Sequence, residues 1–307
     1  MALAHRARRR LPISAPSGVG ISAMRRLAHR SHLAGVLALL AACSAGERGR
    51  PAARATPAQR IVSLSPAITE LLYALGAGDR VVGRTTWCDY PPEARAVASV
   101  GDGLNPNLET IVARRPDLVV VYRSTLNETA ARRLEQLGIA TAVLRQDRLE
   151  DLAADARILG VLTGRVAAGD SIARVIAQVA ATPPAVDLRL RVAFVVWDNP
   201  PMVIGAASYL DQLATLAGAG NVFHDLGTAS GVVSLETIAA RDPDVVVVLA
   251  DSAPAPPPAF ASRREWQVIR AVRERRFVVL AGSLFARPSP RAAAAVAQFR
   301  RLLEAAR

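Results

Sequence analysis

One segment of the chain occurs twice, with its two copies 127 residues apart (234 − 107). The first copy, N-L-E-T-I-V-A-R-R-P-D, spans 107–117 and leads into an apolar run at 118–122; the second, S-L-E-T-I-A-A-R-D-P-D, spans 234–244 and leads into 245–249. Each copy predicts a short helix, a proline stop and a strand, because proline ends helices and Val-rich runs suit a sheet buried on both faces. The sequence therefore predicts two similar α/β lobes.

A second pair of segments extends the duplication. Residues 70–79 and 209–221 both have the apolar spacing of a helix, and a glycine near the end of each precedes a short apolar strand. Glycine supplies the left-handed conformation that closes many helices. The repeat thus covers most of each lobe, and we place the lobes at residues 59–160 and 187–307.

Between the lobes lies a long stretch with helical apolar spacing. It begins near Leu149, is interrupted at Gly164 and stops at Pro183-Pro184. We predict that residues 161–186 form a single helix that links the lobes. Because one helix is a stiff connection, we expect little hinge closure.

The basic N-terminus has the features of an export signal. Residues 1–60 hold eleven arginines and one acidic residue, so they carry most of the formal net charge of +12. A basic segment at 24–30, ten apolar residues at 33–42 and the box L-A-A-C at 40–43 resemble a bacterial lipoprotein signal. We predict a signal peptide at 1–42, of which 1–23 could be an upstream extension, lipidation of Cys43 and a flexible tether at 43–58. The alternative is an ordinary secretory signal cut near Ala42.

Several functions are disfavoured by what the sequence contains. Residues 61–307 carry a net charge of only +2 (12 − 10), which argues against nucleic-acid binding. The sequence has no lysine, no G-x-S-x-G, no H-E-x-x-H and no P-loop, and after the signal it has one histidine, His224. We therefore expect neither an enzyme nor a site for a free metal ion.

Two turns that carry aromatic residues are candidates for a ligand site. The first is T-W-C-D-Y-P-P at 86–92, after a strand predicted at 81–85; the second is W-D-N-P-P at 197–201, after a strand predicted from 191. Ligands of open α/β sheets lie outside the carboxyl ends of the strands, so we expect the two turns to face each other across a cleft. Trp87 either packs into the core of a rigid turn or offers a stacking face to a flat ligand.

Two polar residues are further candidates. Ser65 precedes Pro66, which opens a helix, and we expect Ser65 to cap that helix and face the ligand. Arg287 is the candidate cation of the cleft; the alternative is a surface arginine that pairs with a helix end.

Five segments together resemble a known family. They are R-I-V-S-L-S-P-A-I-T-E (60–70), T-T-W-C-D-Y-P-P (85–92), N-P-N-L-E-T-I-V-A-R-R-P-D-L-V-V (105–120), S-L-E-T-I-A-A-R-D-P-D (234–244) and F-A-R-P-S-P-R (285–291). Over roughly residues 59–305 they resemble the substrate-binding proteins of ABC importers for cobalamin, haem and iron chelates, and most closely the cobalamin-binding type. This resemblance implies two Rossmann-like α/β lobes joined by a single long helix, with the ligand in a cleft between them.

The resemblance also assigns roles to individual residues. Glu109 and Glu236 fall on the two glutamates that dock onto arginines of the membrane permease; the alternative is that each only complements its helix dipole. The expected ligand contacts are Ser65, Trp87, Tyr90, Trp197, Asn199, Tyr209, Phe285 and Arg287. The implied protein is a monomeric, lipid-anchored receptor in the periplasm or on the outer face of the cytoplasmic membrane, with no intrinsic cofactor. Its partners would be an ABC permease and the ATPase subunits of that permease.

The ligand itself stays open between three classes. Cobalamin is the first expectation, although Leu284 and Gly103 occupy positions where cobalamin binders often carry aromatic residues. Haem is an alternative, because Tyr90 or Tyr209 could ligate iron, and a ferric siderophore is another, because Arg84, Arg123 and Arg287 could form a cationic cleft. A scaffold lipoprotein without a ligand is the distant alternative.

Overall fold

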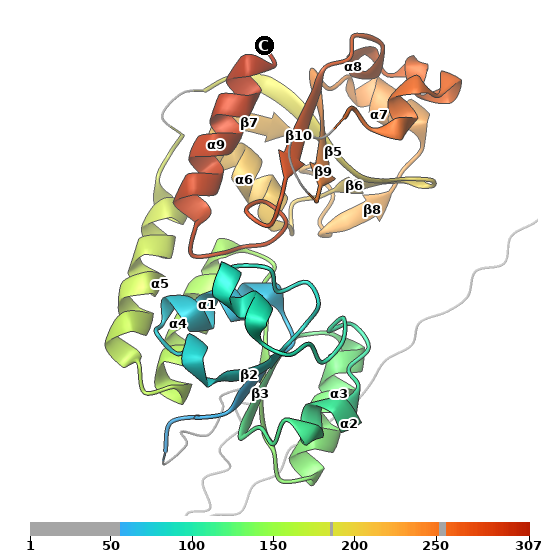
Figure 1. The fold of residues 1–307 in the computed structure, drawn as a ribbon. Helices are drawn as coiled ribbons and strands as arrows, with labels where there is room; N and C mark the ends of the chain where they lie inside the picture. Colours follow the sequence, from blue (N-terminus) through green and yellow to red (C-terminus); the bar gives the residue numbers. More distant parts are fainter. Residues whose placement is uncertain (1–55, 185–186, 252–255) are drawn as a thin grey trace, which may run out of the picture. The chain divides into compact units, whose positions relative to one another are not determined.

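The computed structural model describes residues 56–184, 187–251 and 256–307, and all structural statements below concern these residues. The predicted signal peptide, Cys43 and nearly all of the predicted tether lie outside the described residues. Together the described residues form one compact unit. Figure 1 shows the two sheets of this unit with the helices that cover them.

The first sheet contains four parallel strands in the order β2-β1-β3-β4. Its strands are β1 (Ile61–Ser63), β2 (Val81–Arg84), β3 (Leu118–Tyr122) and β4 (Ala140–Leu144). Its helices are α1 (Pro66–Ala74), α2 (Leu108–Ala113) and α3 (Thr125–Gln136), with short 3-10 turns η1 (Gly78–Arg80) and η2 (Pro92–Ala96). Residues 118–121 of β3 are all buried, as expected for a central strand covered on both faces.

The second sheet repeats this order and adds a hairpin. Strands β7, β5, β9 and β10 are parallel and adjacent in that order, which matches β2-β1-β3-β4. The strands are β5 (Leu190–Asp198), β6 (Pro201–Ile204), β7 (Ala219–Asn221), β8 (Ser230–Val232), β9 (Val245–Ala250) and β10 (Phe277–Ala281). Strands β6 and β8 extend the sheet in antiparallel fashion beyond the second half of β5. The shared strand order confirms the two-lobed α/β fold predicted from the sequence repeat.

The helices of the second lobe vary more in length. They are α6 (Tyr209–Ala217), α7 (Leu235–Arg241), α8 (Arg270–Arg273) and α9 (Ala292–Ala305), with 3-10 turns η3 (Ala259–Ser262) and η4 (Arg264–Val268). Trp266 lies on η4 and is almost fully buried. Helix α9 packs against α6 and α5 and carries Phe299 into the core.

The repeated motif makes the same contacts in both lobes. Asn107 and Ser234 cap helices α2 and α7 by accepting hydrogen bonds from the amides of Thr110 and Thr237. At the far end of α2 the side chain of Arg60 donates to the carbonyls of residues 114 and 115. In the second lobe Arg191 donates in the same way to those of residues 241 and 242. Each arginine lies at the start of the first strand of its lobe. In each lobe, therefore, two hydrogen bonds from this arginine connect the end of the short helix to the sheet.

Two helices connect the lobes. Helix α4 (Leu149–Leu162) ends before Gly164, whose φ of +68° lies in the left-handed region, and α5 (Val166–Ala181) follows. Figure 1 shows α5 leading from the sheet of the first lobe towards that of the second. Helix α5 is shorter than the predicted linking segment 161–186, and the lobe boundaries stay a prediction.

One hydrophobic core extends through both lobes. It includes Leu71 on α1, Leu152 on α4, Leu213 on α6 and Phe299 on α9, all of them fully buried. Burying such side chains stabilises a protein by about 1.5–3 kcal/mol each. Because the same apolar cluster contacts helices of both lobes, the lobes are held together by packing as well as by the chain connection.

A carboxyl group is buried within this helical layer. Asp155 of α4 is only 3% exposed, and its Oδ2 has no hydrogen-bond partner among the described residues. Burial raises the pKa of Asp155 to about 8, with a smaller contribution from the neighbouring Asp151 carboxylate and an opposing one from Gln146. Asp155 is therefore largely protonated in the folded protein at neutral pH.

Replacing Asp155 with asparagine is expected to stabilise the protein above neutral pH. Between about pH 4 and pH 8 the folded protein keeps a proton that the unfolded chain has lost, so the stability of the wild type falls as pH rises through this window. One pKa unit corresponds to about 1.4 kcal/mol, so even half of the shift would contribute about 3 kcal/mol. Urea unfolding at pH 5 and pH 8.5 measures the difference.

The half-exposed Asp170 on α5 provides the matched control, since Asp170→Asn should leave the pH dependence unchanged. An Asp155→Asn protein with the same pH profile as the wild type would contradict the assignment of a raised pKa to this group.

Candidate functional site

A cleft lies at the carboxyl ends of the parallel strands of both sheets. Its volume is about 700 Å³. In the first lobe the cleft is lined by residues that follow β1, β2 and β4 and by the last residue of β3. In the second lobe it is lined by the end of β9 and by the turn after β10. Ligands of open α/β sheets are bound in this position. The predicted cleft between the lobes is therefore present.

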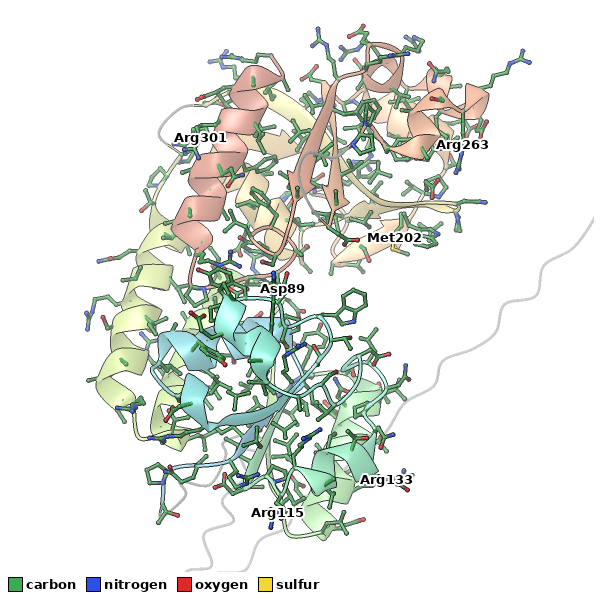
Figure 2. The ribbon with its side chains drawn as sticks, in the orientation of Figure 1. Asp89, Arg115, Arg133, Met202, Arg263 and Arg301 are labelled. Atoms are coloured by element: carbon green, nitrogen blue, oxygen red, sulfur yellow. The ribbon has the colours of Figure 1, made fainter. Side chains whose placement is uncertain are left out.

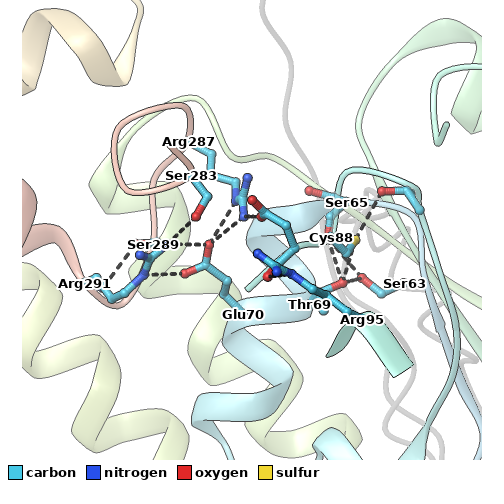
Figure 3. Close-up of polar contacts among 12 residues, drawn as sticks. Ser63, Ser65, Thr69, Glu70, Cys88, Arg95, Ser283, Arg287, Ser289 and Arg291 are labelled. Atoms are coloured by element: carbon cyan, nitrogen blue, oxygen red, sulfur yellow. Dashed lines mark hydrogen bonds and ion pairs between the residues drawn. The ribbon is translucent and has the colours of Figure 1, made fainter. Parts of the chain in front are cut away.

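The turn that carries Trp87 is held by a buried cysteine. Cys88 is fully buried, and its Sγ lies 3.0 Å from Thr69 Oγ1 and 3.1 Å from Thr85 Oγ1 (Figure 3). Because the neighbouring side chain anchors the turn, Trp87 is left 62% exposed and lines the cleft. The indole is thus not packed into the core. It can offer an apolar face to a ligand.

The second aromatic turn forms a smaller pocket that adjoins the cleft. This pocket of about 270 Å³ includes Trp197 and Phe260 and shares Leu249 and Ala250 with the main cleft. Trp197 is 60% exposed, and its Nε1 donates a hydrogen bond of 2.8 Å to the carbonyl of Asn199. Asn199 itself is exposed at the turn between β5 and β6 and is not among the residues that line either pocket.

A buried carboxylate joins the two lobes beside the cleft. Glu70 of α1 is 3% exposed and accepts hydrogen bonds of 2.9 Å from Arg287 and Arg291 of the second lobe (Figure 3). Arg287 also donates to Asp89 at 2.7 Å. The guanidinium of Arg291 lies 3.7 Å from the centroid of the Tyr90 ring. We call these five residues the Glu70 cluster.

The Glu70 cluster changes the interpretation of Arg287. The arginine does line the cleft, but its charge is balanced by Glu70 and Asp89 and its side chain is only 13% exposed. It is therefore not an unpaired cation, and its partner is a buried glutamate rather than a helix end. Figure 2 shows Asp89 at the edge of the first lobe that faces the second lobe.

A second set of hydrogen bonds joins the lobes through α4 and α6. The amide of Leu149 donates to Gln212 Oε1 at 2.9 Å, and Gln212 Nε2 donates to the carboxylate of Glu150. Arg148 Nη1 donates to the carbonyl of Ala206 at 2.8 Å. Together with the Glu70 cluster and the shared core, these contacts fix the position of one lobe against the other.

Carboxylates dominate the charged lining of the cleft. The lining contains Asp89, Asp147 and Asp251 and one arginine, Arg287. Tyr122 donates a hydrogen bond of 2.7 Å to Asp147. Burial and this hydrogen bond raise the pKa of Tyr122 to about 12, so its phenol stays protonated at neutral pH.

Some predicted ligand contacts lie elsewhere. Phe285 is fully buried and Tyr209 is 4% exposed, and both belong to the core shared by the lobes rather than to the lining of the cleft. Burial raises the pKa of Tyr209. Arg84 is not free to bind a ligand, because it donates to the carbonyls of residues 85, 94 and 95. Arg123 is exposed and lies outside the cleft lining.

The expected capping role of Ser65 is wrong. Ser65 occupies the N-cap position of α1, but its side chain makes no capping hydrogen bond. Its Oγ donates instead to Gln146 Oε1 at 2.6 Å, and both residues line the cleft. Pro66 at the first helical position has no N–H, which reduces the need for a cap.

Sequence reasoning missed Glu70, Arg291, Gln146 and Asp147 as parts of the site. The first two are the last residues of S-P-A-I-T-E and F-A-R-P-S-P-R, so the signal was present at the ends of two recognised motifs. Gln146 and Asp147 lie just beyond the carboxyl end of β4, where ligands of open α/β sheets bind, so the apolar run that forms this strand was the available signal.

Glu109 and Glu236 occupy matching exposed positions outside the cleft lining. Each lies in the first turn of its helix, α2 or α7. In Figure 1 both helices lie on the side of their sheets away from α5. Hydrogen bonds from its own backbone amide and from Ser234 lower the pKa of Glu236, so its carboxylate is charged at neutral pH.

Within 56–184, 187–251 and 256–307 no helix is long and apolar enough to cross a membrane. The same residues contain no group of three or more His, Cys, Asp or Glu side chains that could hold a metal ion.

Comparison with known proteins places this geometry in a family. Residues 61–284 match the model of the periplasmic binding protein family. The vitamin B12-binding protein of Salmonella paratyphi A is 34% identical over 194 residues, which cover 62% of this chain and 72% of that protein. The vitamin B12-binding protein of Vibrio cholerae is 27% identical over 253 residues, which cover 80% and 89%.

Solved structures of similar fold bind different ligands. The periplasmic vitamin B12 binding protein BtuF of Vibrio cholerae superposes with a TM-score of 0.65 at 26% identity, covering 81% of this chain and 98% of that one. The periplasmic heme-binding protein BhuT, in complex with two hemes, superposes with a TM-score of 0.69 at 25% identity, covering 82% and 99%. The fold is thus common to receptors for B12 and for haem.

Replacing Glu70 with glutamine is expected to destabilise the protein by about 2–4 kcal/mol. Removing one partner from a buried ion pair leaves charge without compensation, which costs about 3–5 kcal/mol, and the partial exposure of both arginines reduces this figure. Chemical unfolding of the wild type and the variant measures the change.

Asp187→Asn is the matched control, because the Asp187–Arg189 pair is largely exposed and should contribute less than about 1 kcal/mol. Equal stability of the Glu70→Gln protein and the wild type would contradict a structural role of the Glu70 cluster.

Proposed function

Because the chain belongs to the periplasmic binding protein family, we propose that it binds a corrinoid of the cobalamin type and delivers it to an ABC permease. Proteins of this family bind solutes in the periplasm and are not enzymes. The proposal concerns the ligand, the permease and the residues that contact each of them.

The lining of the cleft is the observation that carries the corrinoid proposal. Cobalamin is a broad macrocycle with amide groups around its edge. The exposed face of Trp87 suits the apolar plane of such a ligand, while the carboxylates of Asp147 and Asp251 and the side chain of Gln146 suit its amides. The relatives named as vitamin B12-binding proteins support the same ligand class.

Haem fits this lining less well. Haem carries two propionates, which would approach Asp89, Asp147 and Asp251 with like charge. Its ferric iron is commonly bound by a phenolate, but burial and the hydrogen bond to Asp147 raise the pKa of Tyr122 and keep its phenol protonated, Tyr209 is buried, and Arg291 covers the ring of Tyr90. His224 lies outside the cleft lining. The same carboxylates would repel an anionic ferric siderophore.

Calorimetric titration of residues 50–307 with cyanocobalamin, hemin and ferric enterobactin, an anionic siderophore complex, tests the ligand. We expect one-to-one binding of cyanocobalamin and a loss of about tenfold or more in affinity in Trp87→Ala, because the variant loses a large aromatic contact. The Trp87 indole should also show fluorescence quenching on binding.

Leu137→Ala is the matched control. Leu137 is also 62% exposed, but it follows α3 at the opposite edge of the sheet from the cleft. Binding of hemin without binding of cyanocobalamin would support the receptor function and contradict the assignment of a corrinoid as its ligand. Absence of binding for all three ligands would favour a scaffold protein.

We further propose that Glu109 and Glu236 dock the receptor onto the permease. The two carboxylates are exposed, lie on repeated helices and occur once in each lobe, which suits a partner with two-fold symmetry. Their attraction to arginines would act on encounter and register more than on total affinity. Attachment to the membrane through acylated Cys43 is part of the same proposal and can be checked by the intact mass of the membrane-extracted protein.

Glu109→Ala and Glu236→Ala together should leave cyanocobalamin affinity unchanged and weaken complex formation with the cognate permease by about tenfold or more. Binding of the receptor to permease in nanodiscs measures this effect, and it should be strongest at low salt. Glu304→Ala on the exposed face of α9 is the control. An unchanged affinity of the double variant for the permease would leave only the helix-dipole role for both glutamates.

A further inference from the structure

The charge of the cleft carries an inference about which corrinoids it prefers. Its lining holds three carboxylates, Asp89, Asp147 and Asp251, and one guanidinium, Arg287, which gives a formal charge of −2 (−3 + 1). Behind the lining, Glu70 and Arg291 balance each other. The residues that line the cleft therefore carry a net negative charge.

The three carboxylates differ in how far they are neutralised. Asp89 is paired with Arg287 at 2.7 Å and faces the cleft as part of the Glu70 cluster. Asp147 is 35% exposed and has a cation, Arg145, only at 3.6 Å, with that arginine 60% exposed. Asp251 is exposed at the end of β9 on the opposite wall. Asp147 and Asp251 are thus the two carboxylates whose charge a ligand would meet, one from each lobe.

The carboxylate of Asp147 is fixed in position. It accepts the hydrogen bond from Tyr122, while its backbone amide donates to Asp151 Oδ2 at 3.1 Å. Because the contacts between the lobes also hold the two walls together, the negative charge of the cleft is present before a ligand enters. A preformed field favours a ligand of opposite charge without a cost for rearranging the protein.

Corrinoids differ in net charge while sharing one macrocycle. Cyanocobalamin is neutral, because its cobalt-bound cyanide and the phosphate of its nucleotide cancel the charge of the cobalt centre. A corrinoid that lacks the nucleotide, with one cyanide and one water on cobalt, carries one positive charge. The same molecule with two cyanides is neutral.

We propose that Asp147 and Asp251 make this receptor selective for cationic corrinoids, in particular for those without the phosphate-bearing nucleotide. The proposal rests on the proposed corrinoid function and specifies the charge class of the ligand. The two carboxylates act at the rim of the bound macrocycle from opposite lobes, and neither is required for the apolar contact with Trp87.

The test compares aquocyanocobinamide with dicyanocobinamide, which have the same macrocycle and differ by one charge. The wild type should bind the cationic form about threefold to tenfold more tightly, and this ratio should fall towards one as the salt concentration rises. In Asp147→Asn and Asp251→Asn the ratio should shrink, and in the double variant it should approach one. Asparagine at 147 keeps an oxygen that can accept the Tyr122 hydrogen bond, so folding should be preserved.

The outcomes separate this inference from the underlying function. Asp102→Asn, in an exposed turn outside the cleft lining, is the control and should leave the ratio unchanged. Equal affinity of the wild type for the two cobinamides would contradict the proposed charge selectivity. Binding of cyanocobalamin in the same experiment would still support the proposed corrinoid function. A ratio that persists in the double variant would overturn the assignment to Asp147 and Asp251. Failure to bind any corrinoid would overturn the proposed function itself.

Discussion

The buried carboxylate of Glu70 is the interaction on which the arrangement of the lobes depends. A carboxylate that is almost completely buried is stable only if its charge is compensated, and here two guanidinium groups from the other lobe provide the compensation. One of these arginines reaches Asp89 and the other covers Tyr90, so the same charge also positions the turn next to Trp87. The architecture between the lobes and the shape of the ligand cleft therefore have a common origin.

The duplication of the lobes explains why one part of this architecture was predictable. The repeated L-E-T-I segment, its proline and the following strand are local features, and the structure has them at α2-β3 and at α7-β9 with equivalent capping residues. The position of the cleft also followed from the sequence, because the ends of parallel strands must lie at one edge of a sheet. Local propensity and strand topology thus predicted the fold and the place of the site.

The partners across the lobes could not be predicted in the same way. Glu70 and Arg287 are separated by 217 residues, and a sequence read without its fold does not say which of many arginines meets a given carboxylate. Phe285 and Tyr209 illustrate the related difficulty with aromatic residues, since an aromatic side chain near a motif suits a ligand site and a hydrophobic core equally well. In this chain both pack into the core, whereas Trp87 stays exposed because the buried Cys88 beside it anchors the turn.

The contacts between the lobes bear on how binding energy can be used, because the sequence predicts little hinge closure. A receptor that closes around its ligand spends part of the interaction energy on the movement, whereas a cleft held by the Glu70 cluster, the contacts of Gln212 and a continuous core is already formed. Selectivity must then come from the fixed chemistry of the two walls rather than from closure. In such a cleft the sign of the charge on each wall acts on any ligand that contacts both lobes. With the stiff connection that the sequence predicts, the spacing of Glu109 and Glu236 would stay constant, and a partner that contacts both would recognise the two lobes as one surface.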